Sequence, residues 1–122
     1  MTSVLAVDDL KSMRHMMSLT LVDAGYRVTM AHNGKDALHH IGCAQPDVIL
    51  ADIDMPHMDG IELAKNIRAN PALARIPIVL MSTNSNTTEL DIERAKAAGA
   101  NGWLCKPLDP SHLVETISAV VN

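Results

Sequence analysis

The chain alternates short apolar segments with longer segments of helical periodicity, five times along its length. The apolar segments are residues 4–7, 28–31, 48–51, 78–81 and 103–105. Most of them are apolar at every position rather than at every second one, which is typical of strands buried on both faces of a parallel sheet. Five strand–helix units in series predict a doubly wound α/β fold, with right-handed crossovers and helices on both faces of the sheet.

Capping residues and glycines mark where the intervening helices begin and end. Side chains that accept hydrogen bonds from a first helical turn favour helix starts, and glycine favours helix ends because it adopts a left-handed backbone without strain. The predicted starts are Asn33, Thr88 with Asp91, and Asp109 with Pro110, and the predicted ends are Gly25, Gly42 and Gly99, with Pro71 beyond the third helix.

Length and composition fit one globular domain that spans residues 1–122. The hydrophobic fraction is 48% and the charged fraction 20%, close to the average of globular proteins. The net charge of −4 argues against a nucleic-acid-binding domain, which would carry a basic patch. No apolar run approaches the ~20 residues that span a bilayer, and residues 1–3 lack the features of a signal peptide. We therefore expect a cytoplasmic protein that contacts neither nucleic acid nor membrane.

Polar residues that can carry chemistry follow four of the predicted strands. They are Asp8 and Asp9 after the first strand, Asp52 and Asp54 after the third, Ser82 after the fourth and Lys106 after the fifth. Ligands of open α/β sheets bind beyond the carboxyl ends of the strands, where the strand order reverses. If the order is 2-1-3-4-5, the first and third strands are neighbours at that reversal. Asp8, Asp9 and Asp52 then converge in one place.

This set of residues predicts phosphoryl transfer onto a carboxylate. Carboxylates packed together repel one another unless a cation offsets their charge, and oxygen ligands that leave room for water favour Mg²⁺. Lys106 adds a compact positive charge that suits a phosphoryl oxygen, and Ser82 can donate a hydrogen bond to another oxygen. Because an aspartate beside a divalent cation and a lysine can act as a nucleophile, Asp52 is the predicted phosphoacceptor.

Four segments make the chain resemble the receiver domain of two-component response regulators over essentially its whole length. These segments are residues 5–9, 52–56, 58–60 and 106–107. One segment alone is a weak signal, but together, in this order and at these strand ends, they are specific. Segment 102–110 is similar to that of single-domain, CheY-like chemotaxis regulators. The resemblance implies a flavodoxin-like sheet of five parallel strands in the order 2-1-3-4-5, with five helices.

The resemblance also implies roles for individual residues. Asp52 would accept the phosphoryl group, Lys106 would contact it, and Ser82 would be the switch hydroxyl. Trp103 stands where the family has an aromatic residue or a His that changes rotamer on activation. A Mg²⁺ site would be formed by Asp9, Asp52 and the backbone carbonyl of Asp54, with Asp8 holding the water shell of the metal.

The partners implied by the resemblance are proteins. The phosphoryl group would come from the histidine of a sensor histidine kinase, and the phosphorylated form would present an altered surface to a downstream protein. That protein would be a flagellar motor switch or another signalling protein. Because the sequence ends directly after the fifth predicted helix, we expect a stand-alone regulator rather than one with a DNA-binding effector. It would not be an enzyme in the usual sense, but would assist its own phosphorylation and autodephosphorylation.

Five positions depart from the family pattern. Ser82 replaces the commoner Thr, Thr83 stands where Ala is frequent, Asp54 where chemotaxis regulators often have Asn, and Leu108 where Phe is usual, while Trp103 is larger than the usual aromatic. These departures concern the access of water to the phosphoryl group and the movement of the switch residues.

Simpler interpretations exist for the individual residues and for the function. Asp8 and Asp9 could only cap the first helix, Ser82 could cap a turn, Lys106 could be a surface lysine and Trp103 could simply pack in the core. For Asp59 and Gly60 we favour loop structure alone. The pair Asp52 and Asp54 also resembles the aspartates of haloacid-dehalogenase-type phosphatases, in which the pair follows the first strand of the core. The third candidate is a module that binds partners without phosphorylation.

Overall fold

The computed structural model describes residues 2–82, 89–106 and 108–121, where strands and helices alternate along the chain. The strands are β1 (Ser3–Val7), β2 (Arg27–Ala31), β3 (Val48–Asp52), β4 (Ile78–Ser82) and β5 (Gly102–Cys105). The helices are α1 (Lys11–Asp23), α2 (Gly34–Cys43), α3 (Gly60–Ala69), α4 (Glu89–Ala97) and α5 (Pro110–Val121). Every predicted strand is present, within one residue of the predicted bounds.

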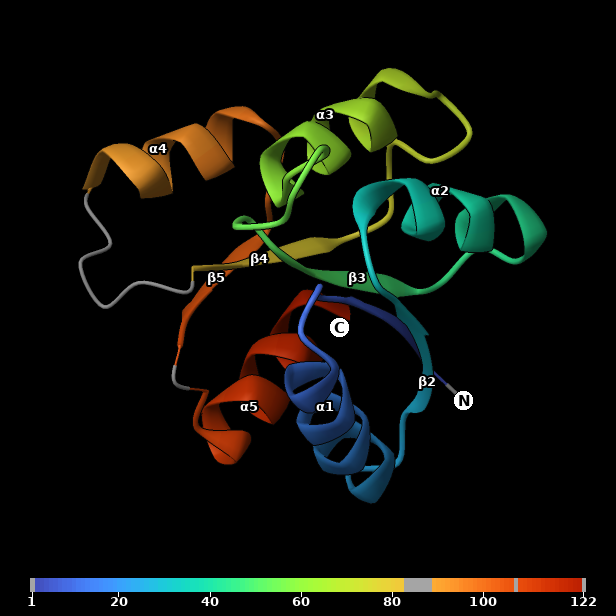
Figure 1. Cartoon of the computed structure of the whole chain (residues 1–122), viewed down its shortest axis with the longest axis vertical. Helices are drawn as coiled ribbons and strands as arrows, with labels where there is room; N and C mark the ends of the chain where they lie inside the picture. The colour runs from blue at the N-terminus through green and yellow to red at the C-terminus, as the bar shows by residue number, and fades with distance from the viewer. Residues whose placement is uncertain (1, 83–88, 107, 122) are drawn as a thin grey trace.

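The five strands form one parallel sheet in the order β2-β1-β3-β4-β5, which confirms the predicted fold and strand order. Helices α1 and α5 cover one face of the sheet, and α2, α3 and α4 cover the other (Figure 1). The order reverses between β1 and β3, which pair directly, with Val7 opposite Ala51. Residues that follow these two strands therefore emerge side by side at the carboxyl edge of the sheet.

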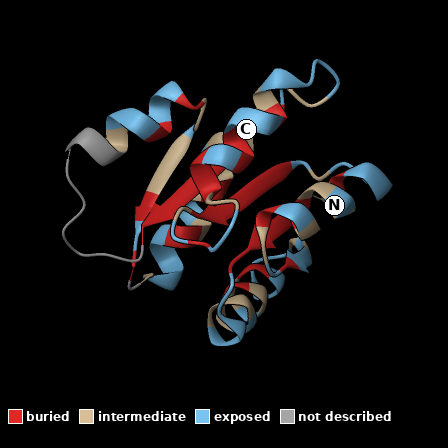
Figure 2. Ribbon diagram, turned by 45° about the horizontal axis from the view of Figure 1, so that its top comes forward, coloured by how far each residue is buried: buried red, intermediate tan, exposed pale blue. Residues whose placement is uncertain are grey.

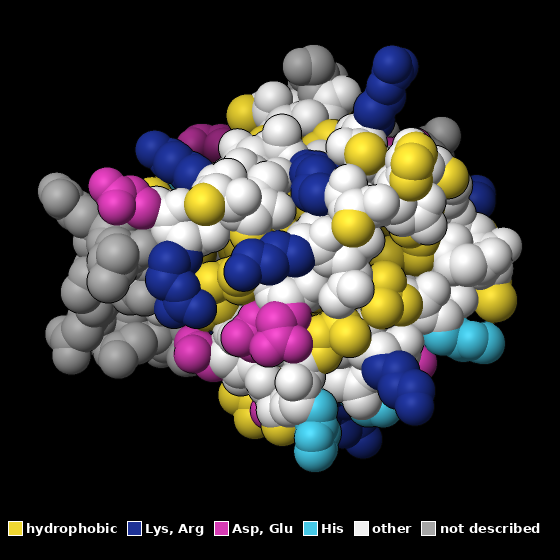
Figure 3. Space-filling model, turned by 90° about the horizontal axis from the view of Figure 1, so that it is seen from above, with side chains coloured by type: hydrophobic (Ala, Val, Ile, Leu, Met, Phe, Trp, Pro, Cys, Tyr) yellow, Lys and Arg dark blue, Asp and Glu magenta, His cyan; other side chains and the backbone are white. Residues whose placement is uncertain are grey.

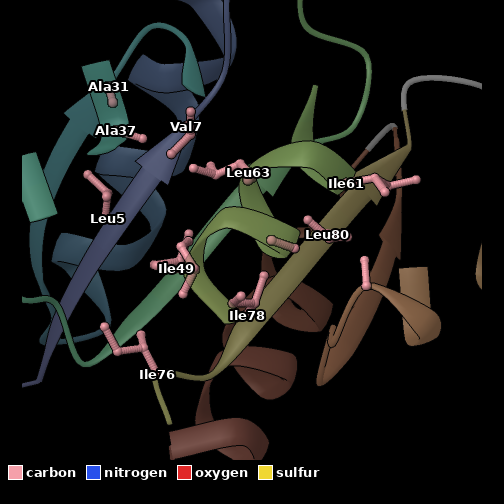
Figure 4. Close-up of a cluster of buried hydrophobic side chains, with 14 of the residues drawn as sticks. Leu5, Val7, Ala31, Ala37, Ile49, Ile61, Leu63, Ile76, Ile78 and Leu80 are labelled. Atoms are coloured by element: carbon pink, nitrogen blue, oxygen red, sulfur yellow. The ribbon is translucent and has the colours of Figure 1, made fainter. Parts of the chain in front are cut away.

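The sheet separates two apolar cores. The core under α2, α3 and α4 includes Leu5, Ile49, Leu63, Ile78 and Leu80 (Figure 4). The core above α1 and α5 includes Met17, Leu21, Leu50, Leu113 and Ile117. Successive residues of a strand point to opposite faces of a sheet, so each strand supplies side chains to both cores. The predicted continuous apolar strands are the consequence of this two-sided burial.

Burial differs between central and edge strands (Figure 2). Strands β3 and β4 are buried at every residue, and β1 is buried from Val4 onward. Strand β2 lies at one edge and is buried only at Ala31, while Met30 is 42% exposed. An edge strand has a neighbour on one side only, which explains why the apolar segment 28–31 is less buried than predicted for a central strand.

Most of the predicted helix boundaries are confirmed. Asn33 Oδ1 accepts a hydrogen bond from the backbone N–H of Asp36 at 2.7 Å, and Asp109 Oδ1 accepts one from Ser111 at 3.0 Å. Gly25 and Gly99 follow α1 and α4 with φ of 97° and 99°, where a side chain would be strained. The prediction that Gly42 ends α2 is wrong by one residue, because the helix continues to Cys43. The predicted Thr88 cap lies outside the described residues.

The face formed by α2, α3 and α4 carries basic and acidic side chains interspersed with hydrophobic ones (Figure 3). No single-sign patch dominates the described part of this face, which agrees with the small net charge of −4. Within the described ranges, no helix is both long enough and apolar enough to cross a membrane.

Candidate functional site

Four buried polar residues gather at the carboxyl edge of the sheet. Asp52 and Ser82 are the last residues of β3 and β4, Asp8 directly follows β1, and Lys106 directly follows β5. These four make up the buried polar and charged residues of the described part of the chain. Burying such groups is costly unless they are paired, so their concentration at one edge marks a candidate site.

Lys106 links the two buried carboxylates. Its Nζ donates a hydrogen bond to Asp8 Oδ2 at 2.6 Å and another to Asp52 Oδ2 at 2.8 Å. Burial acts to lower the pKa of Lys106, but the hydrogen bonds that its ammonium donates to Asp52 and Asp8 outweigh this effect, so the pKa is raised. The ammonium therefore stays charged at neutral pH. Lys106 is a buried ion-pair partner rather than the surface lysine of the simpler interpretation.

Asp52 is a buried carboxylate with one hydrogen bond on each oxygen. Oδ1 accepts from the backbone N–H of Asp54 at 2.9 Å, and Oδ2 accepts from Lys106. Burial raises the pKa of Asp52, although the hydrogen bonds from Lys106 and the Asp54 amide act in the opposite direction. Each carboxylate oxygen has a second lone pair. Asp52 can thus be held in place and still present a free lone pair to an electrophile.

Asp8, Asp9 and Asp52 each offer a carboxylate oxygen within 4.8 Å of the others. Asp8 and Asp52 are buried, whereas Asp9 is exposed. Within the described residues, this is the one group of metal-ligating side chains gathered so closely. Hard carboxylate oxygens with one solvent-facing member fit Mg²⁺, which binds one or two carboxylates and keeps several waters. The three negative charges also exceed the single positive charge of Lys106, so a divalent cation would balance the site.

Asp8 is not the helix cap of the simpler interpretation. The N-cap position of α1 is Leu10, which offers no side-chain cap. Asp8 Oδ1 instead accepts from the backbone N–H of Leu10 at 2.9 Å, one residue before the helix. Asp54 is exposed, and its backbone amide faces Asp52.

Sequence analysis missed the part that Gly60 plays in the site. Asp59 caps α3, because its Oδ1 accepts from the backbone N–H of Glu62 at 2.8 Å, and Gly60 is the first residue of that helix. A Cβ atom on Gly60 would lie 2.5 Å from the backbone oxygen of Asp52 and 3.0 Å from Cα of Ile53. Gly60 is therefore required for α3 to start directly against the backbone of Asp52. Asp59 has a purely structural role, as we favoured from the sequence. For Gly60 that interpretation overlooked the close approach to the backbone of Asp52.

The residues expected to switch lie on the β4–β5 side of the site. Ser82 is buried and pairs in register with Cys105, and its backbone carbonyl accepts from the N–H of Lys106 at 2.9 Å. Trp103 is half-buried and packs against the core under α2, α3 and α4. Its buried Nε1–H has no hydrogen-bond partner among the described residues. Leu108 packs against the opposite core, whereas Thr83 and Pro107 lie outside the described residues.

A parallel sheet in the order 2-1-3-4-5, with acids, a hydroxyl and a lysine at its carboxyl edge, is the arrangement of receiver domains. The family model described as "Response regulator receiver domain" matches residues 4–118. The chain belongs to the response regulator receiver domain family.

The relatives support the same assignment. The chain is 38% identical over 121 residues to the two-component response regulator ORR5 of Oryza sativa, covering 98% of this chain and 88% of the rice protein. It is 42% identical to the chemotaxis protein CheY4 of Vibrio cholerae, whose structure matches with a TM-score of 0.92 over 98% of both chains. A putative response regulator from Chloroflexus aurantiacus matches at 33% identity and a TM-score of 0.92, over 98% of this chain and 97% of the other.

Proposed function

We propose that this chain is a cytoplasmic response regulator, with residues 1–122 as its receiver domain, that accepts a phosphoryl group on Asp52. The observation that carries the proposal is the buried Asp52 carboxylate, held by Lys106 at 2.8 Å beside Asp8 and Asp9. Because the chain belongs to the receiver family, we favour this proposal over the haloacid-dehalogenase-type phosphatase.

The three carboxylates of Asp8, Asp9 and Asp52, called the acidic cluster below, support a Mg²⁺ site next to Asp52. In this proposal Asp9, Asp52 and the backbone carbonyl of Asp54 bind the ion, and Asp8 holds its water shell. When bound, Mg²⁺ supplies positive charge that offsets the negative charge of a phosphoryl group. Lys106 adds a second positive charge from the β5 side, and its hydrogen bond to Asp52 orients the carboxylate.

The proposed reaction transfers a phosphoryl group from a phosphohistidine of a sensor histidine kinase. An Asp52 oxygen lone pair forms the new P–O bond while the P–N bond to the imidazole breaks. The electron pair of that bond stays on the imidazole nitrogen, which then takes up a proton. Lys106 and the hydroxyl of Ser82 hydrogen-bond to the oxygens of the transferred group. Water later cleaves the acyl phosphate, which is the autodephosphorylation step.

The output of the phosphorylated form is proposed to be a changed protein-binding surface on α4, β5 and α5. Ser82 ends β4 and Trp103 lies on β5, so a movement of Ser82 towards a phosphoryl group can reach Trp103 through two paired strands. The similarity to the chemotaxis protein CheY4 supports a chemotaxis-type role, with a flagellar motor switch or another signalling protein as the partner.

Phosphoacceptance can be tested with a small acyl phosphate donor and Mg²⁺. We expect intact-mass spectrometry to show one added phosphoryl group on the wild-type protein and none on Asp52→Asn. Asp54→Asn is the matched control, because it removes an exposed carboxylate two residues away and should still accept the group. Phosphorylation of Asp52→Asn at the wild-type rate would overturn the proposal.

A further inference from the structure

The side chain of Arg14 reaches back from α1 to the loop that carries Asp8 and Asp9. Its Nη1 donates a hydrogen bond to the backbone oxygen of Asp8 at 2.7 Å. The backbone N–H of Arg14 donates to the carbonyl of Leu10 at 3.1 Å, within the first turn of the helix. Arg14 is half-buried, and a hydrogen bond from a charged donor is stronger than one between neutral groups. Arg14 therefore ties the start of α1 to the end of β1.

This hydrogen bond completes the fixation of Asp8. Its backbone N–H donates to Ala31, its Oδ1 accepts from Leu10, its Oδ2 accepts from Lys106 and its backbone oxygen accepts from Arg14. Three of these contacts hold the amide and the side chain of Asp8. Among the described residues, only Arg14 donates to the backbone oxygen of Asp8, which belongs to the peptide unit shared with Asp9.

We infer that Arg14 is a positioning residue for Asp9, and so for the proposed Mg²⁺ site. The atoms of a peptide unit lie in one plane, so the direction of the Asp8 carbonyl sets where the nitrogen and Cα of Asp9 lie. Asp9 is the exposed member of the acidic cluster, without the burial that restrains Asp8 and Asp52. A fixed peptide plane reduces the ordering that Asp9 needs when it binds a cation. This inference rests on the proposed function and deepens its metal site.

The charge of Arg14 and its hydrogen bond act in opposite directions on cation binding. A guanidinium near the acidic cluster repels a divalent cation, so loss of its charge alone would strengthen binding. Loss of the hydrogen bond frees the Asp8–Asp9 peptide and weakens binding. Groups that orient metal ligands typically change metal affinity by about 10- to 100-fold when they are removed. The sign of the change in affinity therefore distinguishes the two effects.

The test measures Mg²⁺ affinity by isothermal titration calorimetry without a phosphodonor. For Arg14→Met we expect about tenfold weaker binding, and for Arg14→Lys, which keeps a charged donor, a value between Arg14→Met and the wild type. Arg75→Met is the matched control, because it removes an exposed arginine before β4, at the opposite edge of the sheet, and should leave the affinity unchanged. Hydrogen exchange of the Asp9 amide should be faster in Arg14→Met than in the wild type.

A purely structural role for Arg14 would lower the unfolding temperature without changing the Mg²⁺ affinity of the folded protein. Equal or tighter binding by Arg14→Met, measured well below its unfolding temperature, would overturn the inference. In phosphorylation assays, Arg14→Met should need about tenfold more Mg²⁺ for half-saturation but reach the wild-type rate at saturating Mg²⁺. If the wild type bound no Mg²⁺ at all, the proposed metal site would fail together with the role of Arg14.

Discussion

Lys106 Nζ lies 2.8 Å from Asp52 Oδ2, although 54 residues separate the two in the chain. Both side chains are buried, and Asp8 shares the same ammonium at 2.6 Å. Asp52 is the last residue of β3, and Asp8 and Lys106 directly follow β1 and β5, so the ammonium of Lys106 joins the ends of three strands. It is also the electrostatic centre of the site, since it holds the candidate nucleophile and offsets part of the negative charge of the acidic cluster.

Replacing Lys106 with Met should leave two buried carboxylates without their cation. Removing one partner of a buried ion pair costs about 3 kcal/mol, so we expect a loss of that size in the free energy of unfolding at pH 7. The loss should be smaller at pH 5, because the folded variant can then protonate a carboxyl group. Urea unfolding at both pH values measures the difference. Equal losses at the two pH values would show that the contact contributes packing rather than charge.

Replacing Asp52 with Asn should stabilise the protein in the absence of Mg²⁺. Burial raises the pKa of Asp52, so folding disfavours its ionised form, whereas Asn carries no charge and Lys106 keeps its ion pair with Asp8. We therefore expect urea unfolding at pH 7 to give a higher free energy of unfolding for Asp52→Asn than for the wild type.

The pH dependence of this gain has a definite sign. The folded pKa of Asp52 lies above its ordinary value of 3.8, so the folded protein binds more protons than the unfolded chain between the two values. The stability that Asp52 contributes is present below pH 3.8 and is lost as the pH rises through the folded pKa. The advantage of Asp52→Asn should therefore be largest at neutral pH and shrink towards pH 3.8. A gain that does not change with pH would contradict the raised pKa.

Mg²⁺ should stabilise the folded protein through Asp9. A ligand that binds only the folded state at one hundred times its dissociation constant adds about 2.7 kcal/mol to the free energy of unfolding. Thermal unfolding with and without Mg²⁺ should show this gain in the wild type and most of its loss in Asp9→Ala. Asp23→Ala, which removes an exposed carboxylate at the far end of α1, is the control that should keep the gain. An undiminished effect of Mg²⁺ on Asp9→Ala would remove Asp9 from the metal site.

The buried strands could be predicted from local patterns, whereas the approach of the acids was predicted only once the resemblance to receiver domains implied the strand order. Continuous apolar segments identified the buried strands, and the known rule for ligand sites in parallel sheets placed Asp8 and Asp52 together. The hydrogen bonds of Lys106 to both carboxylates depend instead on the exact path of the chain after β5. That path is set by side-chain packing over the whole sheet, which residue spacing does not report.

Arg68 shows what residue patterns do not predict. It lies on α3, where an arginine suggests an ordinary exposed position. Its guanidinium donates to the backbone oxygens of Ala74, Ile76 and Gly99 and to Asn101 Oδ1, at 2.7 to 3.1 Å. These acceptors lie in loops up to 33 residues away. Backbone carbonyls are available at every residue, so no residue type in the sequence marks them as partners. The same reason explains why the contact from Arg14 to Asp8 was missed.

Replacing Gly60 with Ala should displace the backbone of Asp52 and so distort the site. The added Cβ would meet the backbone oxygen and carbon of Asp52 at 2.5 and 2.9 Å, and backbone atoms cannot rotate away as a side chain can. The end of β3 or the start of α3 must then shift, and overpacking of this kind costs about 2 kcal/mol. Because Asp52 moves with the backbone, phosphorylation at saturating Mg²⁺ should slow by about 100-fold.

Gly42→Ala is the matched control for this prediction. A Cβ on Gly42 meets nothing within 4 Å, and the residue lies in the last turn of α2. Alanine is better than glycine in a helix, so this variant should be more stable by about 0.5–1 kcal/mol and should phosphorylate at the wild-type rate. Chemical unfolding and the phosphodonor assay measure both quantities for the two variants. If Gly60→Ala behaved like Gly42→Ala, the close approach of α3 to Asp52 would not constrain the site.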